Sequence, residues 1–397
     1  MRLQKLILEQ FRNYKNLELS FDPQEPMTYI VGPNAQGKTN ILESIYLLAL
    51  TKSFRTTKQQ DMIGWEYEYA RVKGIFEEDA DEEARSESPQ SLELEAFLGK
   101  PPNPQKSFKK NQVKTGAANF IGNCQVVFFH PEDLNMLYLG PDLRRAYLNV
   151  ISVQVNRKYF SSLRSYLKVL KQRNALLHAI KDQRATPGEL DVWDEQLVEH
   201  GSYLMFERAQ TIQYFQNQLA STYQKISEGD ENVKIIYHHT LHDIENPEEL
   251  SLQNWRAHFS EQLDRTRPRD LQALVTTIGP HRDDLNFSFD GLNLAACASR
   301  GEYRSLLLAL KLIELKFFEE RSNQKPILLL DDVFSELDPK RQNLLLQAIE
   351  GHQTIITTTH LNDEAATGGP MRTHRNLNVR PGKYLEVSQG IIHEPTA

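Results

Sequence analysis

The first fifty residues alternate between hydrophobic and polar positions and then change to a helical period. Apolar residues recur at short intervals between positions 3 and 11 and between positions 17 and 21, with residues 13–16 as a hairpin turn between the two runs. A third apolar run, residues 27–31, leads into a glycine-rich loop. The helix that we expect next carries Ile41, Leu42 and Ile45 on one face. The pattern therefore predicts a strand–loop–helix unit at the start of an α/β domain.

A long helical and basic region follows in the middle of the chain. Tyr159, Leu163 and Tyr166 repeat at intervals of three or four, and Lys and Arg fill many of the remaining positions. The turn residues 186–188 separate this stretch from a second one at 189–226, which predicts an antiparallel helical hairpin. Strand and helix patterns return from residue 271. We therefore expect one lobe from residues 1–130 and 271–397, and an inserted, mainly helical lobe from residues 131–270.

Composition limits the classes of protein that fit. Lys and Arg number 46 against 53 Asp and Glu, a formal charge of −7, so any DNA contact requires a local basic patch. The acidic stretch at 77–91 is typical of a solvated loop. Two cysteines, Cys124 and Cys297, exclude a disulfide framework. Neither a signal peptide nor an apolar run of about 20 residues is visible, which predicts a cytoplasmic protein with no membrane span.

The glycine-rich loop matches the phosphate-binding pattern G-x-x-x-x-G-K-[ST]. Glycines allow backbone N–H groups to face phosphates, and the following helix adds the partial positive charge of its N-terminus. Lys38 is expected to reach the β- and γ-phosphates and Thr39 to bind Mg²⁺. The sequence therefore predicts ATP and Mg²⁺ as cofactors, with a nucleotide loop formed by Gly32, Pro33, Asn34, Ala35, Gln36, Gly37, Lys38, Thr39 and Asn40.

Two acidic residues end the apolar run at 327–330. A buried parallel strand has this pattern, and α/β proteins bind ligands at the carboxyl ends of such strands. Together with the phosphate-binding loop, the pattern predicts that Asp331 holds Mg²⁺ and that Asp332 polarises the attacking water.

Three further features distinguish subclasses of ATPase. Ser299 and Gly301 precede a long amphipathic helix, as an anion site at a helix N-terminus would, although a plain helix cap is the alternative. His360 follows the strand candidate at 354–356 and is interpreted as a γ-phosphate sensor. With residues 335–338, Ser-Glu-Leu-Asp, this order resembles the ATP-binding-cassette head. In that class the signature Ser-x-Gly of one subunit closes over the nucleotide of the other, which implies a homodimer on ATP.

The chain resembles the RecF family of bacterial recombination mediators more specifically. The resemblance extends along nearly the whole chain, through residues 11–14, 32–40, 52–55, 131–134 with 144–145, 170–177, 279–284 and 329–338. It implies an ABC-type head ATPase, like that of the chromosome-maintenance proteins but without a long coiled coil. It also implies an ATP-dependent dimer that binds DNA at single-strand/double-strand junctions. With RecO and RecR such a protein helps to load recombinase onto gaps, and it feeds the SOS response. Its slow, DNA-stimulated ATP hydrolysis resets the clamp.

For some residues the role implied by the family is less certain, and at some positions the sequence differs from the family. The resemblance implies nucleotide contacts for Arg12 and Asn13 and a phosphate contact for Arg55, but structural ion pairs or turns explain them equally well. Residues 281–284 are explained by a polar turn. The signature has Arg300 and Glu302 where the family usually has Gln, and Glu302 adds a negative charge near ATP. His130 replaces the usual Ser before Pro-Glu-Asp-Leu, at about the position where related ATPases carry a Mg²⁺-sensing Gln, so no sensor is assigned there.

DNA contacts are expected from clustered cations that meet phosphates without reading sequence. A solvated helix face is the alternative for each of them. The candidates are Lys109, Lys110, Arg144, Arg145, Arg164, Lys168, Lys171 and Arg173.

Two other classes share part of the pattern. The ATPase subunit of a transporter would place its signature much closer to the phosphate loop and would lack the basic helical insertion. A small-molecule kinase would not need Ser299 and Gly301. Both are less compatible with the sequence than a DNA-binding ATPase.

Overall fold

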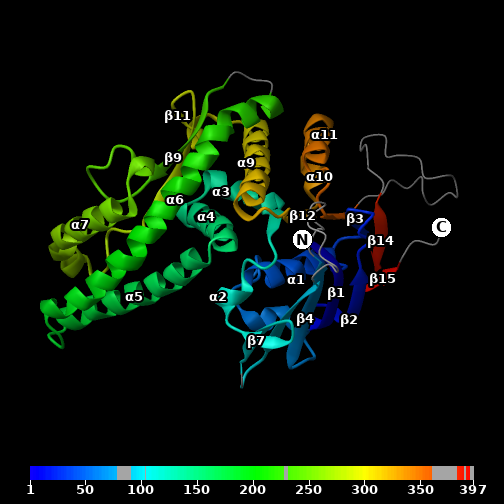
Figure 1. The fold of residues 1–397 in the computed structure, drawn as a ribbon, viewed down its shortest axis with the longest axis horizontal. Coiled ribbons are helices and arrows are strands. Elements are labelled where there is room, and N and C mark those ends of the chain that lie inside the picture. Colours follow the sequence, from blue (N-terminus) through cyan, green and yellow to red (C-terminus); the bar gives the residue numbers. More distant parts are fainter. Residues whose placement is uncertain (78–90, 103, 228–230, 360–381, 389, 394–397) are drawn as a thin grey trace. The chain divides into compact units, whose positions relative to one another are not determined.

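The computed structural model describes residues 1–77, 91–102, 104–227, 231–359, 382–388 and 390–393. The chain forms two compact units, of which the first is Met1–Asp133 with Glu314–Ala397 and the second is Leu134–Ile313 (Figure 1). The expected boundary at 130/131 lies close to the first observed one. The expected boundary at 270/271 is wrong, because residues 271–313 fold with the second unit, where β10 (Asp284–Phe289) pairs with β9 (Val233–His238).

The described part of the first unit contains two six-stranded sheets. One is antiparallel, in the order β2-β1-β4-β5-β6-β7, and contains β1 (Arg2–Phe11), β2 (Tyr14–Ser20), β4 (Tyr69–Glu77), β5 (Ser91–Gly99), β6 (Lys106–Lys110) and β7 (Val113–Thr115). The other, in the order β15-β14-β3-β13-β12-β8, contains β3 (Met27–Val31), β8 (Val126–Phe129), β12 (Ile327–Asp331), β13 (Thr354–Thr358), β14 (Lys383–Ser388) and β15 (Ile391–His393). In the second sheet only the edge strand β15 is antiparallel to its neighbour. Its central strands are buried on both faces, which explains their mainly apolar sequences.

Helix α1 (Lys38–Leu50) packs against strands of both sheets. Its residues from Ile41 to Leu50 are all buried, so the apolar face expected from the sequence is part of a helix that is buried nearly all round. The predicted hairpin is confirmed, but its turn is Arg12–Asn13, because the buried Tyr14 already belongs to β2 and donates its hydroxyl to the Gly37 carbonyl (3.1 Å). The other helical segments of this unit are η1 (Gln59–Met62), α2 (Ala117–Phe120), η2 (Pro131–Leu134, at the boundary), the end of α9 (Arg300–Ser322) from Glu314 onward, α10 (Val333–Glu336) and α11 (Pro339–Ala348).

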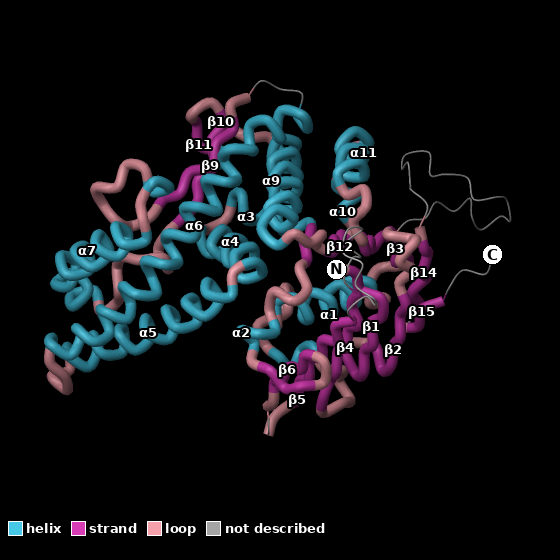
Figure 2. Tube along the Cα trace, in the orientation of Figure 1, coloured by secondary structure: helices cyan, strands magenta, loops and turns pink. Residues whose placement is uncertain are grey.

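The second unit is mainly helical, as expected. Helices α5 (Arg157–Lys181) and α6 (Leu190–Ser227) lie side by side and confirm the predicted hairpin (Figure 2). The remaining elements are α3 (Asn135–Tyr138), α4 (Pro141–Val155), η3 (Pro187–Glu189), η4 (Pro247–Glu249), α7 (Leu252–Ala273), β11 (Leu292–Asn293), α8 (Leu294–Cys297) and the start of α9 (Arg300–Ser322). Among the described residues the longest helix, α6, has 38 residues, so no long coiled coil is present there. None of the helices in these described ranges is long and apolar enough to cross a membrane.

The segment at residues 281–284 is more than a polar turn. The buried Asp283 carboxylate accepts hydrogen bonds from the Tyr237 hydroxyl and from Arg208 (3.3 Å). Arg208, which is also buried, donates to the Pro280 carbonyl (2.6 Å). This segment therefore ties α6 to the sheet of the second unit, and burial of a charged pair explains the acidic and basic residues there without a ligand.

Candidate nucleotide-binding site

The phosphate-binding loop runs from the end of β3 to the start of α1. Lys38 Nζ donates to the carbonyls of Gly32 (2.6 Å) and Pro33 (2.8 Å), so its ammonium lies inside the loop. Gly37 has a φ of 108°, and a Cβ there would lie 2.4 Å from the Asn13 side chain. The second glycine of the motif is therefore required both by its backbone conformation and by the close approach of the hairpin turn.

The carboxylate of Asp331 lies beside the first turn of α1. Its Oδ1 accepts hydrogen bonds from the hydroxyls of Thr39 (3.0 Å) and Thr357 (2.5 Å). Asp331 and Thr357 are paired in register at the ends of β12 and β13, and β13 pairs in turn with β3, which leads into the loop. The carboxyl ends of adjacent parallel strands meet at one edge of a sheet, which explains how these distant residues come together.

Asp332 has a left-handed backbone conformation, with φ 51° and ψ 25°. Its backbone N–H donates to the carbonyl (3.1 Å) and the hydroxyl (3.2 Å) of Thr357. Such conformations in non-glycine residues are uncommon and cluster at functional sites. Here the conformation turns the chain sharply after β12 and keeps Asp332 at the cavity.

These residues surround one polar cavity of about 410 Å³. Burial lowers the pKa of Lys38, and the carboxylates of Asp332 and Asp331 oppose that shift. An ammonium close to hydroxyl and carboxylate groups is suited to a phosphate ligand with a divalent cation. The lining residues are Asn34, Ala35, Gly37, Lys38, Thr39, Asn40, Arg55, His130, Pro131, Asp331, Asp332, Thr357 and Thr359.

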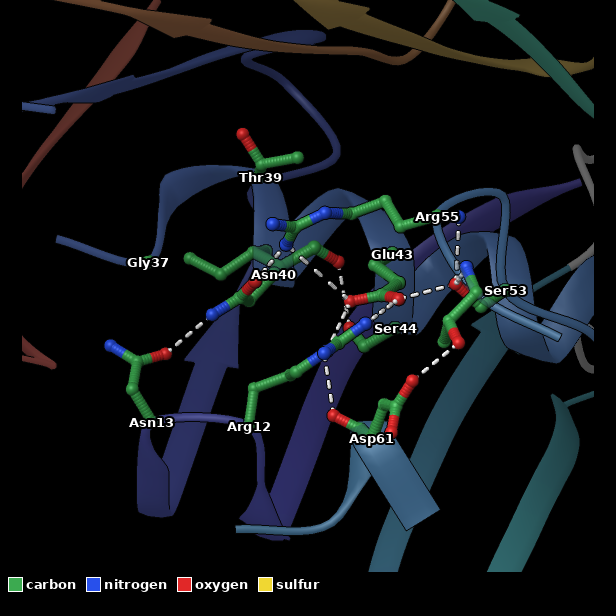
Figure 3. Close-up of polar contacts among 12 residues, drawn as sticks. Arg12, Asn13, Gly37, Thr39, Asn40, Glu43, Ser44, Ser53, Arg55 and Asp61 are labelled. Carbon is green, nitrogen blue, oxygen red and sulfur yellow. Dashed lines mark hydrogen bonds and ion pairs between the residues drawn. The ribbon is translucent and has the colours of Figure 1, made fainter. Parts of the chain in front are cut away.

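Asn13 and Asn40 link the hairpin turn to the loop (Figure 3). Asn13 Nδ2 donates to the Gln36 carbonyl (2.9 Å), and Asn40 Nδ2 donates to Asn13 Oδ1 (2.7 Å). Arg55 Nη1 donates to Asn40 Oδ1 (2.8 Å), so Arg55 reaches the cavity edge from a different segment. Asn13 thus supports the loop from outside the cavity.

Arg12 forms a structural ion pair. Its Nε and Nη2 donate to the two carboxylate oxygens of Glu43 (2.8 and 2.6 Å), and the Glu43 side chain is fully buried (Figure 3). Arg12 does not line the phosphate cavity. It lines a neighbouring cavity of about 550 Å³ with Arg55, Asp61, Trp65 and others. Because Arg55 lines both cavities, the two adjoin at this side chain.

The structure adds two residues to the site that the sequence did not assign. Thr357 binds the Asp331 carboxylate, and its place at the end of a strand next to β12 is the signal that could have found it. His130 lies at the end of β8, with Nε2 at 3.7 Å from Asp331 Oδ2. The sequence marked it as a departure from the family, near the position of a Mg²⁺ sensor in related ATPases, and assigned it no role.

The expected signature residues lie at the start of α9. Glu302 N donates to Ser299 Oγ (3.3 Å), and the Glu302 carboxylate accepts from Ser299 N. This reciprocal arrangement is a capping box, and Gly301 lies within its first turn. His360, the expected γ-phosphate sensor, lies outside the described residues, as do positions 78–90 of the acidic stretch.

The expectation that Arg173 contacts DNA is wrong. Its side chain is fully buried and donates to Asp194 (2.5 Å) and Asp270 (2.7 Å). Residues two apart on a helix do not share a face, so Arg173 points into the unit while Lys171 is exposed. The interval of two from an exposed lysine was the available signal.

The other basic candidates differ in whether their side chains are exposed to solvent or paired with other residues. Arg144 is paired with Asp284 (2.6 Å) and Arg145 with Asp142, and the two arginine side chains are only 11% and 16% exposed. Lys109 pairs with Glu95 (2.8 Å) and Lys110 donates to Asn123 (2.6 Å). The exposed candidates on one face of α5 are Arg164, Lys168 and Lys171.

Comparison with known proteins gives a consistent result. The family described as RecF/RecN/SMC N terminal domain matches residues 2–368. A "DNA replication and repair protein RecF" of Halalkalibacterium halodurans is 38% identical over 364 residues, which cover 91% of this chain and 94% of that protein. One of Lachnoclostridium phytofermentans is 37% identical over 399 residues, with 99% and 100% covered.

Solved structures agree at the level of the fold. The recombination mediator protein RecF-ATP in the RecFOR pathway matches with a TM-score of 0.86 and 30% identity, over 99% of this chain and 97% of that one. An Smc head domain from Pyrococcus furiosus matches with a TM-score of 0.52 and 17% identity, over 98% and 94% of the two chains, a likeness of fold alone.

Proposed function

Because the chain belongs to the RecF family of DNA replication and repair proteins, which are ABC-type ATPases that bind ATP, we propose that it is an ATP-dependent DNA clamp of recombinational repair. It dimerises on ATP, binds DNA at single-strand/double-strand junctions, and helps RecO and RecR to load recombinase onto gaps. Weak, DNA-stimulated ATP hydrolysis resets it.

One observation carries this proposal. The phosphate-binding loop, Asp331 with Asp332, and Thr357 come from distant parts of the chain and line one polar cavity beside a helix N-terminus. A polyphosphate fits there because backbone N–H groups and the Lys38 ammonium face it. Lys38 exchanges its carbonyl partners Gly32 and Pro33 for phosphate oxygens.

The donor set beside the loop fits Mg²⁺. The Thr39 hydroxyl and the Asp331 carboxylate are hard oxygen donors 3.0 Å apart, of the kind that Mg²⁺ prefers. When bound, Mg²⁺ neutralises part of the phosphate charge.

The remaining residues orient the reactants. Asp332 holds the attacking water, and His360 senses the γ-phosphate. Asn13 keeps the loop in shape, and the nucleoside end extends past Arg55 into the neighbouring cavity. Ser299 and Gly301 of a second subunit close on the γ-phosphate and complete the site.

DNA binds through cations that meet its phosphates. The exposed face of α5 with Arg164, Lys168 and Lys171 is the main contact, since these side chains lie at intervals of four and three on one helix. Lys109 and Lys110 contribute after exchanging their protein partners. Binding is therefore salt-sensitive and independent of sequence.

Sedimentation with a labelled gapped duplex tests the proposal. We expect MgATP to convert the wild type to a dimer that carries the DNA, and Asp332→Asn to stay in that dimer because hydrolysis is blocked. Ser299→Arg should bind ATP as a monomer. A Ser299→Arg protein that dimerises on ATP like the wild type contradicts the composite site. A wild type that ignores both ATP and DNA contradicts the clamp.

A further inference from the structure

His130 is held in one orientation at the wall of the phosphate cavity. Its Nδ1 accepts a hydrogen bond from the backbone N–H of Glu132 (3.1 Å), at the start of the turn that follows β8. Its ring lies against Phe54 and Phe128, with centroids 5.7 and 5.4 Å away. The ring therefore has little freedom to turn, and its other nitrogen faces the cavity.

This arrangement also fixes the tautomer. A ring nitrogen that accepts from a backbone N–H carries no proton, so the neutral imidazole has its proton on Nε2. Nε2 faces Asp331 Oδ2 at 3.7 Å, which is longer than a hydrogen bond but close enough for an electrostatic contact. The group beside the carboxylate is therefore an N–H donor.

The other oxygen of Asp331 is already occupied. Oδ1 accepts from the hydroxyls of Thr39 and Thr357, which leaves Oδ2 to the His130 side of the cavity. A neutral donor there orients the carboxylate without cancelling its charge, whereas a cation would compete with Mg²⁺ for it.

We propose that His130 is a positioning residue that uses its Nε2–H to orient Asp331 for Mg²⁺ binding. The proposal rests on the proposed function, because it takes Asp331 as a ligand of the MgATP complex. It gives a role to a cavity residue at which the sequence departs from the usual Ser of the family.

Three substitutions separate the donor from the packing. His130→Gln places an amide N–H near the position of Nε2, His130→Asn places one near Nδ1, and His130→Phe keeps an aromatic ring without a donor. His178→Gln, at an exposed position of α5, is the matched control. The measurement is a Mg²⁺ titration of the binding of a fluorescent ATP analogue, with thermal unfolding to verify the fold.

We expect His130→Phe and His130→Asn to raise the Mg²⁺ concentration at half-saturation about tenfold, as loss of a group that orients a metal ligand does. His130→Gln and His178→Gln should stay within about twofold of wild type, and binding without Mg²⁺ should not change. Nitrogen-15 NMR of the ring should show a proton on Nε2.

Equal Mg²⁺ dependence in the Phe and Gln variants, wild-type behaviour of the Asn variant, or a proton on Nδ1 overturns the role of His130. If the wild type itself binds the analogue without any Mg²⁺ dependence, the proposed MgATP site fails instead. The two failures are therefore distinguishable in one titration.

Discussion

The hydroxyl of Thr39 lies 3.0 Å from a carboxylate oxygen of Asp331, although 292 positions separate the two residues in the sequence. Thr39 belongs to the first turn of α1, which precedes the second unit in the sequence. Asp331 ends β12, which follows the second unit in the sequence. The two halves of the nucleotide site thus come from the two segments of the first unit. The site forms only when those segments fold into one sheet.

Thr39→Val and Asp331→Asn should each weaken MgATP binding, and their effects should not add. Both side chains serve the same ion, so removing the second costs little once the first is gone. Mg²⁺ titrations of the two single variants and the double variant measure this coupling. A double variant whose loss equals the sum of the single losses would show that the two residues act independently.

Local patterns predicted the elements that build the site. Strand β3, the phosphate-binding loop and helix α1 follow one another directly in the sequence, so periodicity and motif predicted this strand–loop–helix unit. The apolar residues of β12 end at the acidic pair, so the same kind of pattern predicted the position of Asp331. The boundary near residue 270 did not follow, because β10 is assigned to the second unit by its pairing with β9 across α7. That pairing is non-local and leaves no mark in the composition of either segment.

Arg173 shows for one side chain that contacts between distant segments cannot be predicted from local sequence. Its neighbours on α5 suggested a basic face, but its partners Asp194 and Asp270 lie on α6 and α7. Only the packing of three helices identifies the two carboxylates that pair with it. A periodic pattern predicts which face of a helix is apolar more reliably than it predicts which charge is paired.

Arg173→Met should lower the free energy of unfolding by about 3–5 kcal/mol, because it leaves the buried Asp270 carboxylate without this cation and leaves Asp194 with Arg267 as its remaining cation. Urea unfolding followed by fluorescence measures the loss. At urea concentrations too low to unfold the variant, its DNA affinity should equal that of the wild type, since the Arg173 side chain has no exposed surface.

Lys168→Gln with Lys171→Gln is the matched comparison on the same helix. These exposed changes should leave the free energy of unfolding within about 0.5 kcal/mol of wild type. They should reduce both DNA affinity and its dependence on salt, as the loss of phosphate contacts does. Unchanged DNA binding in this double variant would exclude this face of α5 as the contact.

Glu302→Gln should strengthen ATP-dependent dimerisation. The Glu302 carboxylate caps Ser299 N, at the helix end where the proposed partner phosphate must dock, and its negative charge opposes that phosphate. Glutamine can still accept from Ser299 N but carries no charge. We expect the ATP concentration at half-maximal dimerisation to fall about fivefold, which corresponds to about 1 kcal/mol.

Glu189→Gln provides a control for this change. Glu189 completes a second capping box, with Thr186, at the start of η3. The substitution alters the same motif and the same net charge, and it should leave dimerisation unchanged. Equal effects of the two substitutions would point to net charge rather than to the signature.

His281 makes the stability of the second unit depend on pH. Its Nδ1 contacts the Tyr166 hydroxyl (2.6 Å) and its Nε2 the Thr276 carbonyl (3.1 Å), so the neutral ring satisfies both partners. Burial lowers the pKa of His281 from 6.5 to about 4. The Thr276 hydrogen bond and Asp270 oppose the shift, whereas Arg282 and Arg145 add to it.

Because the folded state takes up the proton less readily than the unfolded state, the contribution of His281 to stability is present above pH 6.5 and is lost as the pH falls towards 4. The buried Asp283, whose pKa burial raises to about 6, acts in the opposite direction, and the loss that His281 itself contributes should reach about 3 kcal/mol in the free energy of unfolding. His281→Gln should remove most of this dependence, and His178→Gln, at an exposed position, should keep it. Urea unfolding at pH 7.5 and pH 4.5 measures the difference for each variant. If His281→Gln loses as much stability between these pH values as the wild type does, the pH dependence arises from other groups, and the buried ring is not its source.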